Sequence, residues 1–187
     1  MNHEGKILGE YWNYGYLPDF TDIDINNDGT KEIIFVGTNN EYGKGCLVAF
    51  DSININGCSP QSPELKCIGF ETCQQKYYML FPRTDLDLIE NPINSLTSID
   101  ILKNGHISVT TANTIVFFEL SDKFEVHDVR LSHQFIRKHK MAKLEGKTNS
   151  ELNRHYEERL AKDVLYYNGR NWVLNPTGVS NWKNRAD

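Results

Sequence analysis

Short apolar runs separated by turn-forming residues are the feature that most limits how this chain can fold. Eight runs are rich in valine, isoleucine, threonine and aromatic residues, at 6–12, 31–37, 46–53, 76–81, 97–102, 106–112, 114–120 and 125–131. The segments between them, such as NNDG, NNEYGKG and KNG, favour turns. Short strands with turns at this rate predict a mostly-β fold with antiparallel sheets. Residues 54–75 show little periodicity and are expected to form a long loop.

A helix and a final hairpin are expected near the C-terminal end. A capping box of the T-x-x-E type begins at Thr148. An apolar residue then recurs at every fourth position, at Leu152, Tyr156 and Leu160, which predicts one helix of about three turns. Residues 164–175 contain two apolar runs around Asn168-Gly169, a strong signal for the type I′ turn of a β-hairpin.

The most specific chemical signal is the stretch DIDINNDGTKEII at residues 22–34. Its side chains Asp24, Asn26 and Asp28 alternate, so a tightly turned loop can direct their oxygen atoms to one centre. Gly29 permits the sharp bend that follows. Calcium takes six to eight oxygen ligands at about 2.3–2.6 Å. The spacing therefore predicts a calcium-binding loop.

Two further residues extend this oxygen set. Thr30 can offer its backbone carbonyl and Glu32 a closing carboxylate, while Asp22 is either a ligand or a solvated neighbour. A helix-loop-helix calcium hand needs a glutamate at the twelfth loop position. Counted from Asp24, that position is Phe35, inside an apolar strand, so this loop is expected to join two strands. The alternative is a metal-free turn, because Asp, Asn and Gly favour turns without any ion.

The segment DINNDGTKEIIFVG resembles the FG-GAP/VCBS-type repeat of integrin-like β-propellers, whose pattern is D-x-[DN]-x-D-G-x-x-[DE] before an apolar strand. The resemblance covers residues 17–50. It implies a calcium-binding loop within a propeller blade. It also implies three side-chain ligands, one backbone ligand and one closing acid, in the order Asp24, Asn26, Asp28, Thr30 and Glu32. The family more often has aspartate in the last place, and the resemblance does not extend to the predicted helix or hairpin.

A degenerate second copy of this pattern lies near residues 97–120. TDIDINNDGTKEI at 21–33 aligns without gaps with TSIDILKNGHISV at 97–109, where the strand and the glycine turn persist and the charges are lost. We expect a single domain with these parts: a first blade at 5–57, the loop at 54–75, a second blade at 76–131, and the helix and hairpin at 148–175. Because a closed propeller needs about four to eight blades, a partial or open propeller within a larger protein is expected.

Composition limits the partners. The net charge of −5 gives no general attraction to nucleic acid. No apolar run approaches the roughly 20 residues of a membrane span. The first residues lack the pattern of a secretory signal. An extracytoplasmic location is therefore implied by the family resemblance alone.

The cysteines and the catalytic motifs give little evidence for an enzyme. The four cysteines include no C-x-x-C pair, which disfavours a cysteine zinc site. Cys46 is expected to be a buried thiol, whereas Cys58, Cys67 and Cys73 lie in one polar region and are free thiols or include a disulfide. No nucleophile elbow, zinc-protease or phosphate-binding glycine motif is present.

Other segments have an ordinary and a functional interpretation. The basic segment 132–143 is a solvated face or a patch for phosphate or an acidic partner. His106 and His127 have no acid at a useful spacing, which favours structural roles. The five aromatic residues in 10–20 form core packing or a stacking surface for a glycan or peptide. The acids in 83–90 form an exposed loop or a second cation site.

These observations favour a non-catalytic, calcium-binding, propeller-like module that contacts a protein or glycan. Two alternatives are left open: a hydrolase or lyase on a β scaffold, and a metal-free accessory or sensor domain. The ligand and the oligomeric state are not determined by the sequence.

Overall fold

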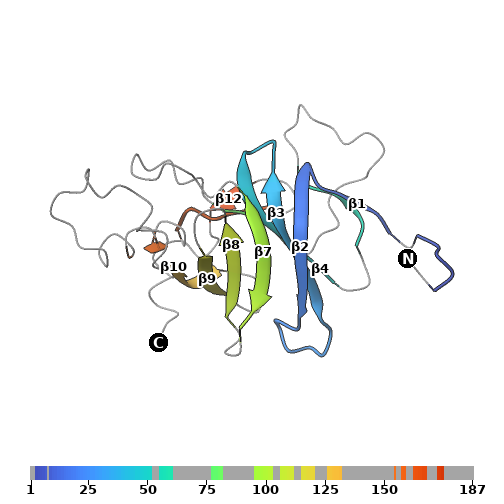
Figure 1. Ribbon diagram of the computed structural model, residues 1–187, viewed down its shortest axis with the longest axis horizontal. Helices are drawn as coiled ribbons and strands as arrows, with labels where there is room; N and C mark the ends of the chain where they lie inside the picture. The colour runs from blue at the N-terminus through green and yellow to red at the C-terminus, as the bar shows by residue number, and fades with distance from the viewer. Residues whose placement is uncertain are drawn as a thin grey trace.

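The chain folds mainly into β-strands in the part that the computed structural model describes (Figure 1). That part comprises residues 3–7, 9–51, 55–60, 77–81, 95–102, 106–111, 115–120, 126–131, 154, 157–158, 162–167 and 172–174. Its strands are β1 (Tyr11–Trp12), β2 (Gly15–Ile23), β3 (Glu32–Asn39), β4 (Lys44–Asp51), β5 (Gly57–Cys58), β6 (Tyr77–Leu80), β7 (Leu96–Ile101), β8 (Ile107–Thr111), β9 (Ile115–Leu120), β10 (Val126–Leu131), β11 (Leu165–Tyr167) and β12 (Trp172–Leu174). The predicted mostly-β class with antiparallel sheets is confirmed.

The larger sheet has six antiparallel strands in the order β12-β11-β6-β4-β3-β2. Strand β4 lies inside this sheet, and residues 45–50 are all buried. A short, continuous apolar run of this kind suits a strand that is covered on both faces. Its sequence therefore differs from that of β2, the strand at the edge, where exposed and half-buried residues are mixed.

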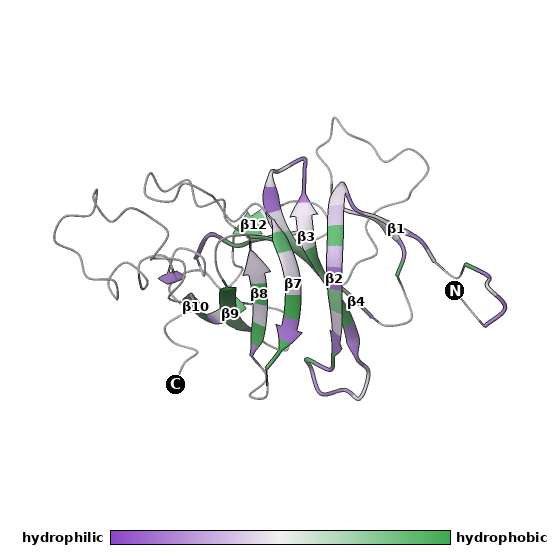
Figure 2. Ribbon diagram, viewed as in Figure 1, coloured by the Kyte–Doolittle hydropathy of each residue, from purple (hydrophilic) through white to green (hydrophobic). Residues whose placement is uncertain are grey.

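The smaller sheet has four antiparallel strands in the order β10-β9-β8-β7, so that each strand pairs with the next one in the chain. Hydrophobic and hydrophilic residues are interspersed along β7 (Figure 2). Its buried residues, Leu96 and Ile99, are three positions apart because the register with β8 shifts between Leu96 and Ser98. The buried side chains of this sheet and of one face of the larger sheet form a common core, which includes Ile34, Val36, Leu47, Met79, Phe81, Leu96, Ile99, Ile107, Val109, Val116, Phe118 and Val126.

The opposite face of the larger sheet has a second, smaller core. It consists of Cys46, Val48, Phe50, Tyr78 and Leu80. A buried hydrogen-bond network crosses it: the Tyr78 hydroxyl donates to Asn13 Oδ1 at 2.8 Å and accepts from Asn39 Nδ2 at 3.0 Å. Asn13 lies between β1 and β2, and Asn39 ends β3. The network therefore links the N-terminal strands to Tyr78 in β6, inside the larger sheet.

Cys46 is a buried thiol, as predicted, and it should resist alkylation in the folded protein. Burial raises the pKa of this thiol from 9.0 to about 12, which leaves little of the reactive thiolate at pH 8. We expect iodoacetamide to label Cys46 slowly in native protein and rapidly in concentrated urea, as measured by mass spectrometry of tryptic peptides. Equal labelling rates in native buffer and in urea would contradict the burial of this side chain.

The same thiol should make stability depend on pH. Because the pKa of Cys46 is higher in the folded than in the unfolded protein, the free energy of unfolding should fall as the pH rises from 9 toward 12.

The two sheets also meet at their edges, where β2 lies beside β7 (Figure 1). The carboxylate of Asp19 in β2 accepts a hydrogen bond from the backbone N–H of Ile99 in β7, at 3.0 Å. Residues 15–23 were not predicted as a strand. Their mixed burial, and a proline at position 18 beside an irregularity in register, suit an edge strand whose outer side needs no partner strand.

Each copy of the predicted internal repeat spans a pair of strands. Residues 21–33 lead from β2 into β3, and residues 97–109 lead from β7 into β8. Each pair is the first antiparallel hairpin of its sheet along the chain. The pairing differs by one residue between them, since Ile23 pairs with Glu32 whereas Ile99 pairs with Val109, so the repeat stays a prediction. The predicted boundary at residue 76 separates β6 from the sheet to which it belongs, since β6 pairs with β4 and β11.

The C-terminal predictions are described only in part. Strands β11 and β12 pair in an antiparallel manner, as expected for the final hairpin. Of the predicted helix the structure describes only residues 154, 157, 158, 162 and 163, so the helix stays a prediction. No sheet closes on itself among the described strands. The propeller-like arrangement likewise stays a prediction.

Candidate functional site

The predicted calcium loop connects β2 to β3 and is held by its own side chains. Both carboxylate oxygens of Asp24 accept backbone N–H groups, Oδ1 from Asp28 at 3.1 Å and Oδ2 from Gly29 at 2.9 Å. Asn26 Oδ1 accepts the same Asp28 N–H at 3.0 Å. The backbone can present these N–H groups because Asn27 and Gly29 have positive φ angles of 56° and 86°. Asp24 and Asn26 are therefore brought together around one backbone group.

The remaining predicted ligands, Asp28, Thr30 and Glu32, lie in the second half of the loop and at the start of β3. Asp28 Oδ1 accepts the backbone N–H of Thr30 at 2.8 Å, and Asp28 Oδ2 accepts an N–H of the Asn26 amide at 2.8 Å. Glu32 begins β3, is only 1% exposed, and accepts the backbone N–H of Ile25 through Oε2 at 3.1 Å. A buried carboxylate thus closes the loop at its strand end, where the closing acid was predicted.

The carboxylates of this loop are not drawn together as closely as a bound ion would require. Among the described residues, the one group of three His, Cys, Asp or Glu side chains with ligand atoms within 4.8 Å of one another lies elsewhere in the fold. Asp24, Asp28 and Glu32 instead satisfy backbone N–H groups. Each carboxylate oxygen has two lone pairs, so an oxygen that accepts an N–H can also coordinate a cation. The donor set, entirely oxygen, suits calcium.

Asp22 is engaged outside this set. Its Oδ2 lies 2.6 Å from Lys31 Nζ in an exposed ion pair. The hydrogen bond from Lys31 lowers the pKa of Asp22, and the same contact raises the pKa of Lys31. The Lys31 ammonium group is thereby directed to Asp22, which is expected to be a neighbour of the loop and not a ligand.

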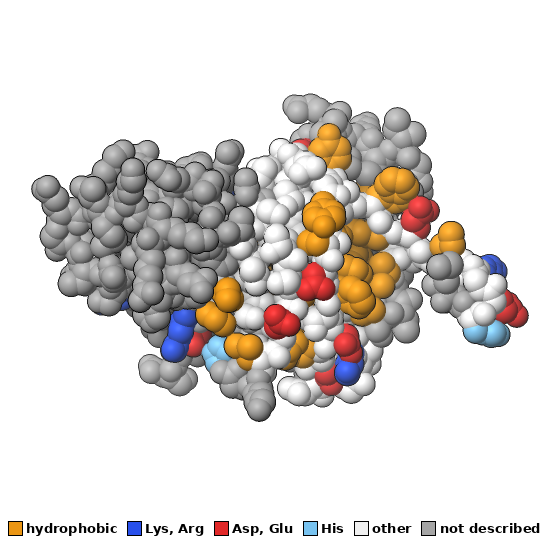
Figure 3. All heavy atoms as spheres, in the orientation of Figure 1, with side chains coloured by type: hydrophobic (Ala, Val, Ile, Leu, Met, Phe, Trp, Pro, Cys, Tyr) orange, Lys and Arg blue, Asp and Glu red, His pale blue; other side chains and the backbone are white. Residues whose placement is uncertain are grey.

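Exposed aromatic side chains lie in and between β1 and β2, the strands that precede the loop, and Phe20 is the one nearest to it in the sequence. Trp12, Tyr14, Tyr16 and Phe20 are between 44% and 64% exposed. Figure 3 shows hydrophobic side chains gathered over β2 on the face in view. Tyr11, by contrast, packs edge-on against Phe50 with ring centroids 4.7 Å apart. The aromatic segment 10–20 therefore serves both core packing and an exposed surface. An open hollow beside it is lined by Phe20, Asp22, Gly29, Thr30, Lys31 and Ile33.

A second group of possible ligands was missed by the sequence analysis. His106 lies beside two acids, Glu119 and Asp128, although no acid stands at a useful spacing from it in the sequence. The acids are 13 and 22 positions further along the chain. Only the strand register brings them together, and no local spacing marks them.

Three predicted features lie outside the described residues: the basic segment 132–143, the acids of 83–90, and Cys67 with Cys73. Cys58 is described and is a buried thiol. The described residues include no helix long and apolar enough to cross a membrane.

Comparisons with known proteins place no further constraint on the site. No family model matches this chain, and neither a curated protein nor a solved structure does.

Proposed function

We propose that this chain is a non-catalytic β-module that binds calcium at residues 24–32 and contacts a protein or glycan through the adjoining surface. The observation that carries this proposal is the folding of the loop. The oxygens of Asp24 and Asn26 meet at one backbone N–H, and the buried carboxylate of Glu32 closes the same turn. A calcium ion there would hold the start of β3 to the end of β2.

Charge supports a cation at this loop. Asp24, Asp28 and Glu32 bring three carboxylates into one short loop. The adjacent cation, Lys31, forms its ion pair with Asp22. These three negative charges would attract a divalent cation to the loop, and their oxygen atoms are the ligands that calcium prefers. The proposed role of the ion is structural. An ion that binds only the folded chain stabilises the folded state by mass action.

The strand order supports a propeller-like assignment for the module. Propeller blades are four-stranded sheets, and β7 to β10 form such a sheet, with each strand beside the next in sequence. Strands β2, β3, β4 and β6 follow the same up-and-down order within the larger sheet. The internal repeat falls on the first hairpin of both runs.

The surface next to the loop supports contact with a partner. The hollow combines an aromatic ring, Phe20, with the polar groups of Asp22, Thr30 and Lys31. Aromatic faces with polar groups at their edge suit both a sugar ring and a protein side chain. Gly29 and Thr30 belong to the calcium loop as well as to the hollow. Calcium is therefore expected to strengthen partner binding by fixing this part of the surface.

Calcium binding can be tested by isothermal titration of the chain with calcium chloride. We expect one equivalent to bind, and Asp28→Asn to weaken binding by about tenfold or more, because one ligand charge is lost while the shape is kept. Asp22→Asn is the matched control, since this carboxylate pairs with Lys31. It should leave the affinity within about threefold of wild type.

Two results would contradict the proposal. The first is the absence of heat and of any shift in melting temperature at millimolar calcium. The second is an equal loss of affinity in Asp28→Asn and Asp22→Asn, which would indicate general attraction of calcium to an acidic surface.

A further inference from the structure

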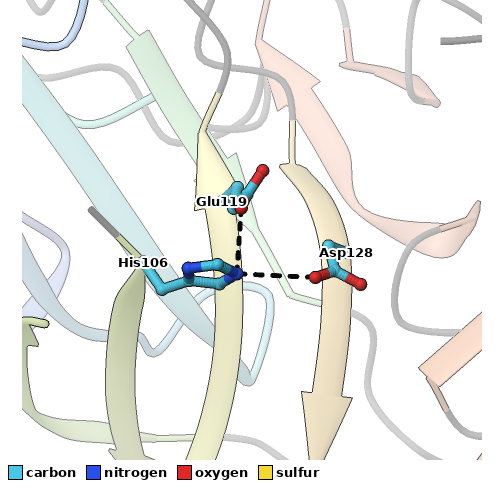
Figure 4. Close-up of side chains that lie close together, drawn as sticks. All are labelled: His106, Glu119 and Asp128. Carbon is cyan, nitrogen blue, oxygen red and sulfur yellow. Dashed lines mark hydrogen bonds and ion pairs between the residues drawn. The ribbon is translucent and has the colours of Figure 1, made fainter. Parts of the chain in front are cut away.

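Three side chains of the smaller sheet converge on its surface (Figure 4). His106 directly precedes β8, Glu119 belongs to β9 and Asp128 belongs to β10. His106 Nε2 lies 2.9 Å from Glu119 Oε1 and 3.4 Å from Asp128 Oδ2. The three ligand atoms all lie within 4.8 Å of one another. These side chains do not belong to the calcium loop, which lies between β2 and β3.

The strand register explains why His106 and Glu119 meet. Ile107 pairs with Phe118, so the preceding residue, His106, falls opposite Glu119. Ile107 and Phe118 are both buried in the common core. Because side chains alternate along a strand, His106 and Glu119 lie on the face turned away from that core.

An irregularity in β10 brings in the third side chain. Val126 and Val129 both face the core, three positions apart, where a regular strand would alternate every second residue. The register of β10 with β9 shifts between His127 and Arg130, and Asp128 has a φ angle of 41°. A bulge of this kind adds one residue and redirects a side chain. Here the redirected side chain is that of Asp128, which reaches His106.

Arg130 fixes the orientation of the Asp128 carboxylate. Its Nη2 lies 2.9 Å from Oδ2 and 3.1 Å from Oδ1, and its Nε lies 3.2 Å from Oδ1. Ligating carboxylates are commonly held in this way by an outer hydrogen-bond partner. A carboxylate has about four lone-pair positions, so these contacts leave one on Oδ2 for a metal ion.

The distances suit a small transition-metal ion. Around tetrahedral zinc, with ligands at about 2.0–2.1 Å, neighbouring ligand atoms are separated by about 3.3 Å. The two separations from His106 Nε2, 2.9 and 3.4 Å, are close to this value, and the two carboxylate oxygens lie within 4.8 Å of each other. His106 is 19% exposed, whereas Glu119 and Asp128 are 48% and 41% exposed, so the outer side of the group is open to solvent. A water molecule can take the fourth position there.

We propose that His106, Glu119 and Asp128 form a second cation site, which takes a divalent transition metal of the zinc type. The imidazole nitrogen separates this site from the calcium loop, because calcium and magnesium prefer oxygen ligands while imidazole favours zinc, copper and nickel. The bound ion links β8, β9 and β10 across the exposed face of their sheet. This proposal stands independently of the calcium loop.

The test is a titration of the full chain with zinc chloride in excess calcium, so that the loop at residues 24–32 does not compete. Wild type should bind one zinc equivalent more than His106→Gln or Asp128→Asn. Both variants should bind zinc at this site at least about 100-fold more weakly than wild type. Losing an outer hydrogen-bond partner already lowers metal affinity by about 10–100-fold, and losing a ligand should cost at least as much. His3→Gln is the matched control, since the His3 side chain is 90% exposed and lies far from His106 in the sequence. Its zinc isotherm should equal that of wild type.

X-ray absorption of the zinc-loaded wild type decides the proposal without any variant. A first shell of nitrogen and oxygen with one imidazole is expected, and a shell that contains sulfur would overturn the proposal by placing zinc on cysteine. Equal zinc isotherms for wild type, His106→Gln and Asp128→Asn would overturn it too, and would leave the three residues as an ion-paired cluster. Glu119→Gln replaces either variant that fails to fold, as judged by far-UV circular dichroism.

Discussion

Replacing Phe118 with alanine should lower the free energy of unfolding by about 3–5 kcal/mol, the usual cost of removing a buried phenylalanine ring. Phe118 in β9 is fully buried, and its ring centroid lies 5.7 Å from that of Phe81. Phe81 follows β6 in the larger sheet, so this pair of rings spans the boundary between the two sheets. Removing one ring leaves a cavity where the sheets meet.

Urea denaturation followed by circular dichroism measures this change, and Phe20→Ala provides a matched control. Phe20 is 63% exposed on β2, so its loss should change the free energy of unfolding by less than about 1 kcal/mol. Because both sheets contribute to one core, Phe118→Ala should shift a single transition. Two separate transitions, only one of which moves, would show that the sheets unfold independently.

The buried strands could be predicted from the sequence, whereas the exposed edge strand could not. In β3 and β4 hydrophobic side chains follow one another closely, because the larger sheet is covered on both faces. Strand β2 mixes exposed aromatics with half-buried polar residues, and it contains a proline. Its stability comes from pairing with β3 and from contact with β7, which no local pattern records.

The two candidate sites differ in the same way. The loop from Asp24 to Glu32 is local: its predicted ligands lie within nine consecutive residues, and Asn27 and Gly29 between them have positive φ angles. Its spacing is therefore visible in the sequence. The group around His106 depends on the register of three strands and on the bulge at Asp128. Neither property can be derived without first knowing which strands are neighbours.

Replacing Asp24 with alanine should have a second large effect, but only when calcium is present. Without calcium, the change removes the acceptor of two backbone N–H groups in a part-exposed turn, which costs about 1 kcal/mol. With calcium at 100 times its dissociation constant, wild type gains about 2.7 kcal/mol that the variant cannot gain. The difference between the two proteins should therefore widen to about 4 kcal/mol.

The measurement is urea unfolding of both proteins, once in excess calcium and once in a calcium chelator. Asp22→Ala is the control, because Asp22 pairs with Lys31, and its effect should be the same in both conditions. If the difference between wild type and Asp24→Ala does not change with calcium, the loop is a metal-free turn. In that case the loss of stability in Asp24→Ala measures only the two hydrogen bonds that Asp24 accepts from the backbone. These bonds hold the turn whether or not an ion is bound.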